Sequence, residues 1–416
     1  MNSDIASARY LMPDLLRGIA LMGICLANFS EFSLYSFLPA SATAAMPSAS
    51  IDTVVRYLQY LFIDGKFYTI FSLLFGVGFS IFFTNALKKK RNGILLFYRR
   101  MTILFLFGLA HLIFLWAGDI LILYAFLGFF LPLFRNISDK KLIIAAIILL
   151  LIPILIDTCI SLFDWNLSAP VIQATQYFHA KAGITPENFP IWLANAQHYT
   201  DILSFNIAGS FIRMQEFIEC NRAFKVMGLF LIGFYIGRKR FYAQLGNYSS
   251  VLQKIMIIGF VVGLPLSALY AWNMTHNVPL KMAASAALYT FSVFPLSFAY
   301  MTAICLIYIK WKESASISRR IAGGIAHIVA LTGRMALTNY IMQSVFGILI
   351  FYGIGLGWGA KTGIVHAELI ALTVFSIQVI YSYLWLKYFR FGPMEWSWRI
   401  LTYGEWLSIK KIINKK

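Results

Sequence analysis

Long apolar runs recur along the whole chain and decide its fold class. A helix needs about 20 apolar residues to cross the roughly 30 Å hydrocarbon core of a bilayer, and runs of that length follow one another throughout this sequence. Of the 416 residues, 60% are hydrophobic and only 12% are charged, whereas soluble proteins average about 25% charged residues. The sequence therefore predicts an all-α, polytopic bundle in a membrane.

The apolar runs, and the short polar segments that separate them, predict about ten transmembrane helices. The expected ranges are 13–33, 66–87, 97–116, 120–134, 141–162, 222–237, 251–272, 282–309, 328–352 and 366–388. Most of the 35 Lys and Arg fall in short loops on one side if both termini are cytoplasmic, as the positive-inside rule requires. Because the basic residues follow this pattern, the net charge of +18 does not indicate nucleic acid as a partner.

One long hydrophilic stretch divides the predicted spans into two groups of five. Residues 1–162 are expected to form the first group, and residues 222–416 the second group with a cytoplasmic tail. The extracytoplasmic segment between them, 163–221, is too long for a simple connector and predicts a lid or interfacial helices. The four cysteines are scattered and lack metal-ligand spacing, so no metal site is expected.

The first span, Pro13–Glu31, carries polar groups on one face. At 100° per residue, one narrow stripe contains Asp14, Arg17, Leu21, Cys25 and Asn28. Arg17 and Asn28 lie eleven residues apart, about 16 Å along the axis. Unpaired polar groups are costly in hydrocarbon, so this stripe must face protein or water. It predicts a polar cavity beside the first helix.

Other polar residues fall near the ends of later spans. Asp64, His111, Asp119 and Glu368 are expected near the outer ends, and Arg100 and Arg334 near the inner ends, while Asn339 and Gln343 share a stripe within the ninth span. In the second span, Ser72, Gly76 and Ser80 recur every four residues. That pattern predicts close packing against another helix.

Three sequence blocks together resemble a known family. They are Asp14-Leu15-Leu16-Arg17-Gly18 with Asn28; Gly65-Lys66-Phe67 through Phe71-Ser72-Leu73-Leu74-Phe75-Gly76; and Gly333-Arg334-Met335-Ala336-Leu337-Thr338-Asn339-Tyr340 with Phe391-Gly392-Pro393-Met394-Glu395-Trp396. The whole chain resembles the YeiB-like family of bacterial inner-membrane proteins, whose C-terminal half defines domain of unknown function 418. The resemblance implies a multi-pass protein of the bacterial inner membrane.

That family is distantly similar to transmembrane acyltransferases such as heparan-α-glucosaminide N-acetyltransferase. The similarity implies transfer of an acyl group from cytoplasmic acyl-CoA, as co-substrate, to an extracytoplasmic saccharide or lipid-linked acceptor. The block around Arg17, together with Asn28 and Asp64, matches the first two helices of the heparan enzyme. Its catalytic histidine, just after the first helix, has no counterpart, because the first histidine here is His111.

Acyl transfer needs a base for the acceptor and a donor for the oxyanion. We assign His111 as the base, Asp119 or Asp64 as its orienting partner, and Asn28 as the oxyanion or acceptor ligand. For substrate binding, the guanidinium groups of Arg17, Arg100 and Arg334 suit phosphates. The remaining candidates in the cavity are Asn339, Gln343 and Glu368. No covalently bound cofactor is expected.

Structural interpretations of the same residues stay open. His111 could lock two helices, Asp119 could cap the fourth span, and Asn339 and Gln343 could make interhelical hydrogen bonds only. The arginines could contact membrane lipid headgroups. At the level of function, the alternatives are a transporter or exporter of a small amphiphile and a non-catalytic membrane partner. The oligomeric state is also open, with a homodimer as one alternative.

Overall fold

The computed structural model of the 416-residue chain describes residues 10–88, 92–185, 187–313 and 317–411. It is 81% helical, and the one pairing of extended backbone among these residues is an isolated bridge between Phe389 and Lys410. The principal helices are α1 (Leu11–Phe32), α3 (Ala49–Phe62), α4 (Lys66–Lys88), α5 (Gly93–Phe114), α6 (Leu121–Gly128), α7 (Asp139–Phe163), α8 (Ala169–Lys181), α9 (Phe189–Ala194), α10 (Tyr199–Glu219), α11 (Arg222–Arg238), α12 (Ser249–His276), α13 (Met282–Glu313), α14 (Ile317–Arg334), α15 (Ala336–Phe351), α16 (Ile364–Tyr388) and α17 (Pro393–Tyr403).

The helices form a multi-pass membrane bundle with fewer spans than the sequence predicts. Within the described residues, seven segments are long and apolar enough to cross a membrane, or eight if the bent pair α14–α15 counts as one. The predicted spans over 120–134 and 222–237 are not among them. Helix α6 has only 8 residues and gives way to a short turn containing Pro132. Helix α11 has 17 residues and lies between α4 and α7.

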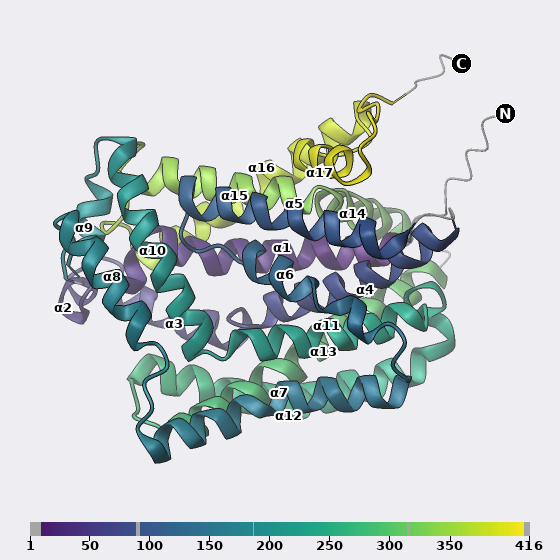
Figure 1. The fold of residues 1–416 in the computed structure, drawn as a ribbon, viewed down its shortest axis with the longest axis horizontal. Helices are drawn as coiled ribbons and strands as arrows, with labels where there is room; N and C mark the ends of the chain where they lie inside the picture. The colour runs from purple at the N-terminus through teal and green to yellow at the C-terminus, as the bar shows by residue number, and fades with distance from the viewer. Residues whose placement is uncertain (1–9, 89–91, 186, 314–316, 412–416) are drawn as a thin grey trace.

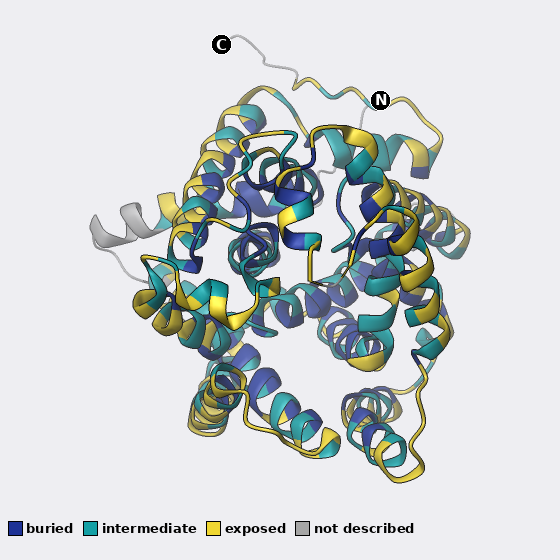
Figure 2. Ribbon diagram, turned by 90° about the vertical axis from the view of Figure 1, so that its left-hand side faces the viewer, coloured by how far each residue is buried: buried dark blue, intermediate teal, exposed yellow. Residues whose placement is uncertain are grey.

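Helix α1 runs through the middle of the bundle, which is why its polar stripe cannot face lipid (Figure 1). It packs against α14, α4, α16 and α15. Helices α8 to α10, from the predicted outer segment, gather at one end of the molecule, and α17 lies toward the other end with the start of α1. Figure 2 shows exposed residues mainly on the outward faces of the helices and buried ones toward the centre.

The predicted small-residue seam on α4 is confirmed. A Cβ added at Gly76 would lie 2.1 Å from the backbone oxygen of Phe230, and one at Gly233 would lie 1.9 Å from that of Leu73. Ser80 lies opposite Gly237 in the same interface. Helices α4 and α11 therefore touch backbone to backbone, which holds the buried α11 against the centre of the bundle.

The predicted span over 328–352 is broken. Helices α14 and α15 meet at Met335 with a bend of 79°, so α14 crosses α1 and α15 continues in another direction, still in contact with α1. The crossing is close, because a Cβ at Gly333 would lie 2.0 Å from the backbone oxygen of Asp14, and one at Gly18 would lie 2.2 Å from that of Val329. The sequence blocks around Arg17 and Arg334 thus meet through their glycines.

Replacing Gly333 with Ala should destabilise the protein, because the added methyl group overlaps the backbone of α1. We expect a loss of about 1–3 kcal/mol, measured by thermal unfolding in one detergent. Gly324→Ala, on the same helix with open space around it, is the matched control and should be neutral or stabilising by up to about 1 kcal/mol. Equal effects of the two substitutions would contradict the close crossing.

Candidate functional site

A large cavity follows the polar stripe of α1 through the bundle. Its volume is about 1970 Å³, well above the roughly 300–1,000 Å³ of a typical small-molecule pocket. Asp14, Arg17, Leu21 and Asn28 all line it, as the wheel of α1 predicts. Cys25 is the exception on that stripe, since its thiol is buried and faces the backbone oxygen of Ala371.

One end of the cavity, here called the basic mouth, is lined by Arg17, Arg100, Arg334, Arg390, Arg399 and Lys411. The guanidinium of Arg100 stacks on the ring of Trp398 at 3.5 Å, and the Trp398 indole N–H donates to the backbone oxygen of Arg100 at 2.9 Å. Stacking fixes the plane of the guanidinium while leaving its edge N–H groups for a ligand. Arg17 is paired with Asp14 at 2.9 Å.

The wall of the basic mouth is built by a contact between the two C-terminal sequence blocks. The carboxylate of Glu395 on α17 accepts hydrogen bonds from the backbone N–H groups of Leu337 (2.7 Å) and Thr338 (3.1 Å) and from the Thr338 hydroxyl (2.6 Å). These N–H groups belong to the first turn of α15, which has no other capping side chain. Glu395 therefore caps the helix that the bend at Met335 exposes.

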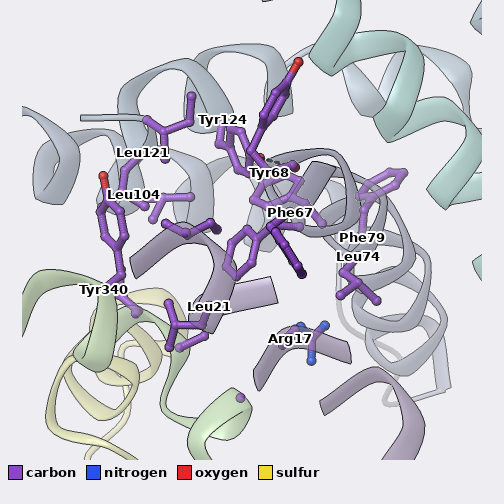
Figure 3. A pocket seen from close by; sticks show the side chains of 18 of the residues that line it. Arg17, Leu21, Phe67, Tyr68, Leu74, Phe79, Leu104, Leu121, Tyr124 and Tyr340 are labelled. Carbon is purple, nitrogen blue, oxygen red and sulfur yellow. Dashed lines mark hydrogen bonds between the residues drawn. The ribbon is translucent and has the colours of Figure 1, made fainter. Parts of the chain in front are cut away.

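The middle of the cavity is apolar and aromatic. Leu21, Phe67, Leu74, Phe79 and Leu104 converge on it from α1, α4 and α5 (Figure 3). At its edge, the hydroxyls of Ser72 and Tyr124 share a hydrogen bond of 2.5 Å. An extended, mostly neutral chain would fit this stretch between the two polar ends.

The other end, here called the distal chamber, is lined by Asn28, Glu31, Asp64, Arg222 and Lys225. Asp64 accepts a hydrogen bond from the hydroxyl of Tyr270 at 2.9 Å. The ammonium of Lys225 lies 4.2 Å from the ring centre of Tyr289, whose hydroxyl donates to that of Tyr68 at 3.1 Å. Carboxylate, amide and cationic groups thus face one space.

The predicted contact between His111 and Asp119 is present, but the pair lies outside the cavity lining. His111 Nδ1 is 2.9 Å from Asp119 Oδ2, and Nε2 is 2.8 Å from the Ser344 hydroxyl, with both residues buried. Asp119 Oδ1 also accepts from the N–H of Ile122 at 2.8 Å, so Asp119 caps α6 as well. Asp64, the other predicted partner of His111, is bonded to Tyr270 instead.

The His111–Asp119 pair is linked indirectly to the cavity through Arg213 of α10. The guanidinium of Arg213 donates hydrogen bonds to the backbone oxygens of Gly118 and Asp119 and forms an ion pair with Glu216. Arg213 and Gly118 both line the cavity. The pair therefore fixes a loop that borders the distal chamber.

Three other predicted site residues lie in the packing between helices. Asn339 donates to the Ser382 hydroxyl at 2.9 Å, and Gln343 donates to the Gln378 side-chain oxygen at 3.1 Å; both are fully buried. Glu368 accepts from Gln59 at 3.0 Å. None of these three lines the cavity, so the structure separates them from Arg17, Asn28, Asp64, Arg100 and Arg334, which it brings together there.

Several cavity residues were not singled out in the sequence. Glu31 lies three residues after Asn28 and so shares its helical face. Lys225 is a cation near the start of an apolar run, which is itself a signal, since charges in such runs face cavities or partners. Tyr270 and Trp398 carried no such signal, and Glu395 was noted only as part of the third family block, because each meets the cavity through contacts between segments distant in sequence.

The fold and this site define a class: a multi-pass helical membrane protein built around one long polar cavity. The chain is 30% identical to "Uncharacterized protein YxaH" of Bacillus subtilis (strain 168), over 99% of this chain and 98% of that protein. It is 26% identical to "Uncharacterized protein YeiB" of Escherichia coli (strain K12), over 94% and 95%. Residues 236–405 match the family model "Protein of unknown function (DUF418)".

The chain belongs to the DUF418 family, and its predicted resemblance to YeiB is confirmed. A third relative is "Uncharacterized 39.9 kDa protein in amylase 3'region" of Bacillus acidopullulyticus, 29% identical over 94% of this chain and 93% of that protein. No solved structure matches the chain.

The Glu395 cap should make stability depend on pH. Burial raises the pKa of Glu395 above its ordinary value of 4.5, although its hydrogen bonds oppose the shift. The unfolded chain then releases this proton first as pH rises, so the stability contribution of Glu395 is full below about pH 4.5 and is lost as pH rises through the folded pKa. The melting temperature of the wild type minus that of Glu395→Gln should therefore fall as pH rises across this range. A difference that rises with pH would contradict this sign.

Proposed function

We propose that this protein is a membrane acyltransferase that takes an acyl group from acyl-CoA at the basic mouth and passes it to an acceptor in the distal chamber. The observation that carries the proposal is the order of groups along one cavity: arginines at one end, an apolar middle, and Asn28 with Asp64 at the other end. The same order is found along acyl-CoA, with phosphates first, then the neutral pantetheine arm, then the thioester.

The size and charge of the cavity support two substrates. Its volume of about 1970 Å³ exceeds what one small ligand needs. With the basic mouth on the cytoplasmic side of a bacterial inner membrane, as the positive-inside rule favours, the donor would enter from the cytoplasm. The saccharide or lipid-linked acceptor would then enter from the opposite side.

The reaction exchanges one carbon–sulfur bond for one carbon–oxygen bond and moves the hydroxyl proton, by way of the base, to the leaving thiolate. The acceptor hydroxyl oxygen attacks the thioester carbonyl carbon, the carbon–sulfur bond breaks, and CoA leaves as a thiolate that takes up a proton. In this proposal Asp64 accepts the hydroxyl proton, because it is a carboxylate on the cavity lining. The amide of Asn28, for which the described residues offer no hydrogen-bond partner, donates to the oxyanion.

His111 has a positioning role in this scheme. Both of its ring nitrogens are engaged, by Asp119 and Ser344, so a substrate hydroxyl would have to displace one of them. The pair instead holds the loop that carries Gly118 and binds Arg213. Asn339, Gln343 and Glu368 likewise support the helices that enclose the cavity, as hydrogen-bonding groups of α15 and α16.

Donor binding is tested first. Arg100→Gln should weaken acetyl-CoA binding about tenfold, because a charge-assisted hydrogen bond to phosphate is lost. Isothermal titration calorimetry on the purified protein in nanodiscs measures the dissociation constant. Arg99→Gln is the matched control, since Arg99 is the neighbouring cation and does not line the cavity. Absence of acetyl-CoA binding to the wild type would overturn the proposed donor.

Turnover is tested with [1-14C]acetyl-CoA and proteoliposomes of bacterial polar lipid, by following label into lipid and water-soluble fractions. Asp64→Asn should slow transfer about 10²–10⁴-fold, which is the usual rate contribution of a general base, while acetyl-CoA binding stays unchanged. His111→Gln should retain more transfer per folded molecule than Asp64→Asn. The opposite order would return the role of base to His111.

A second candidate, transport of an anionic amphiphile, is favoured by the length of the cavity, which has lining residues from the first turn of α1 to its last. The break between α14 and α15 also resembles the discontinuous helices of transporters, although it lies beside the basic mouth. A transporter would move the intact probe across the proteoliposome membrane without releasing CoA. Measurement of free CoA in the same assay separates the two functions.

A further inference from the structure

Two cations of the distal chamber have no acidic side chain within ion-pair distance among the described residues. Arg222 and Lys225 lie on the first turn of α11 and line the cavity. Within the described residues neither makes a hydrogen bond or an ion pair, and their contacts are with the rings of Tyr68 and Tyr289. Lys225 is only 7% exposed. An aromatic ring stabilises an ammonium but leaves its N–H donors unused, and a buried charge of this kind requires a counter-charge.

The carboxylates around these cations are engaged elsewhere. Asp157 accepts from the Asn221 amide at 2.6 Å, and Glu219 accepts from the Ser168 hydroxyl at 2.7 Å and from Gln215 at 2.9 Å. Asp64 accepts from Tyr270. Glu31 lines the same space as Arg213 and Arg222. The chamber therefore combines carboxylates that can accept from hydroxyls with two cations available to an anion.

The backbone at this place also favours an anion. Asn221 adopts a left-handed conformation with φ of 49°, which separates α10 from α11 and starts α11 inside the cavity wall. No side chain caps the first turn of α11, so its N–H groups and the positive end of the helix dipole are available. The positive end of the helix dipole repels two cations placed on this turn, and an anion bound between them offsets that repulsion. Arginine, lysine and free helix N–H groups together are typical of phosphate sites.

We propose that the first turn of α11, with Arg222 and Lys225, binds a phosphate group of the acceptor, and that the nearby Asp64 receives the acceptor hydroxyl. The acceptor is then a phosphorylated polyol or sugar. The phosphate site stands on its own geometry, while its assignment to the acceptor rests on the proposed acyl transfer. The phosphate could belong to a lipid headgroup or to a soluble phosphate ester, and the experiment separates these sources.

Cys220 offers a direct reporter. It is exposed, lines the cavity and precedes Arg222 by two residues. In a Cys159→Ser background, the other two cysteines are buried, so charged methanethiosulfonates report on Cys220. In phosphatidylcholine nanodiscs, the anionic reagent should react about fivefold faster than the cationic one, after correction for their rates with free thiol, because the local potential is positive. Arg222→Gln and Lys225→Met should each lower this ratio, and Arg222→Lys should preserve it.

Ligand protection is measured in the same preparation. Glycerol phosphate in solution, or phosphatidic acid in the nanodisc, should slow modification of Cys220 at least threefold, and Lys225→Met should abolish the protection. Protection by glycerol phosphate supports a soluble acceptor, and protection by phosphatidic acid alone supports a lipid-borne one. Arg240→Gln, at a cation elsewhere on the same cavity, is the matched control and should leave protection intact.

Two outcomes would overturn the phosphate site: no protection of the wild type by either probe, or equal protection of wild type and of folded Lys225→Met. Melting temperatures and size-exclusion profiles identify variants that have not folded, and Arg222→Lys tests the charge without removing it. The labelling needs no turnover. Protection in a protein that transfers no acetyl group would therefore overturn the acyl transfer and leave the phosphate site standing.

Discussion

The cost of placing charge inside a membrane governs this structure. Arg17 and Asn28 lie on one face of a helix whose other faces are packed by apolar neighbours, and neither group is stable in hydrocarbon without partners or water. The bundle meets this constraint by surrounding α1 and leaving a cavity along its polar face. The close backbone contacts at Gly18, Gly333, Gly76 and Gly233 keep the enclosing helices in place.

The cavity separates two kinds of polar chemistry by an apolar middle. The cations of the basic mouth are oriented by stacking and by contacts with backbone, as Arg100 is by Trp398. The distal chamber instead mixes carboxylates held by neutral donors with cations resting on aromatic rings. A ligand that spans both ends must therefore be anionic at one end and capable of hydrogen bonding at the other, which is the physical basis of the proposed donor and acceptor.

Local pattern in the sequence was enough to predict the helical membrane class, the polar face of α1, the seam on α4 and the contact between His111 and Asp119. Each depends on residues close together in the chain or on one helix. The path of the chain around Met335 was not predictable in this way, because the cap of α15 comes from Glu395, about sixty residues later. The sequence left open whether His111 acts as a base or locks two helices, and local pattern could not decide this, since Ser344 closes its second nitrogen from a distant helix. The number of spans was overestimated because α6 and α11 are apolar through burial among other helices.

The Glu395 cap also bears on how the protein is assembled. Helix α17 follows the membrane-crossing segments found among the described residues, so during synthesis the first turn of α15 stays uncapped until Glu395 has been added. The wall of the basic mouth consequently cannot be completed before α17 has been made. Until then the guanidinium of Arg100 has no Trp398 indole to stack on. A nascent chain therefore cannot present the completed set of cations to an anionic ligand.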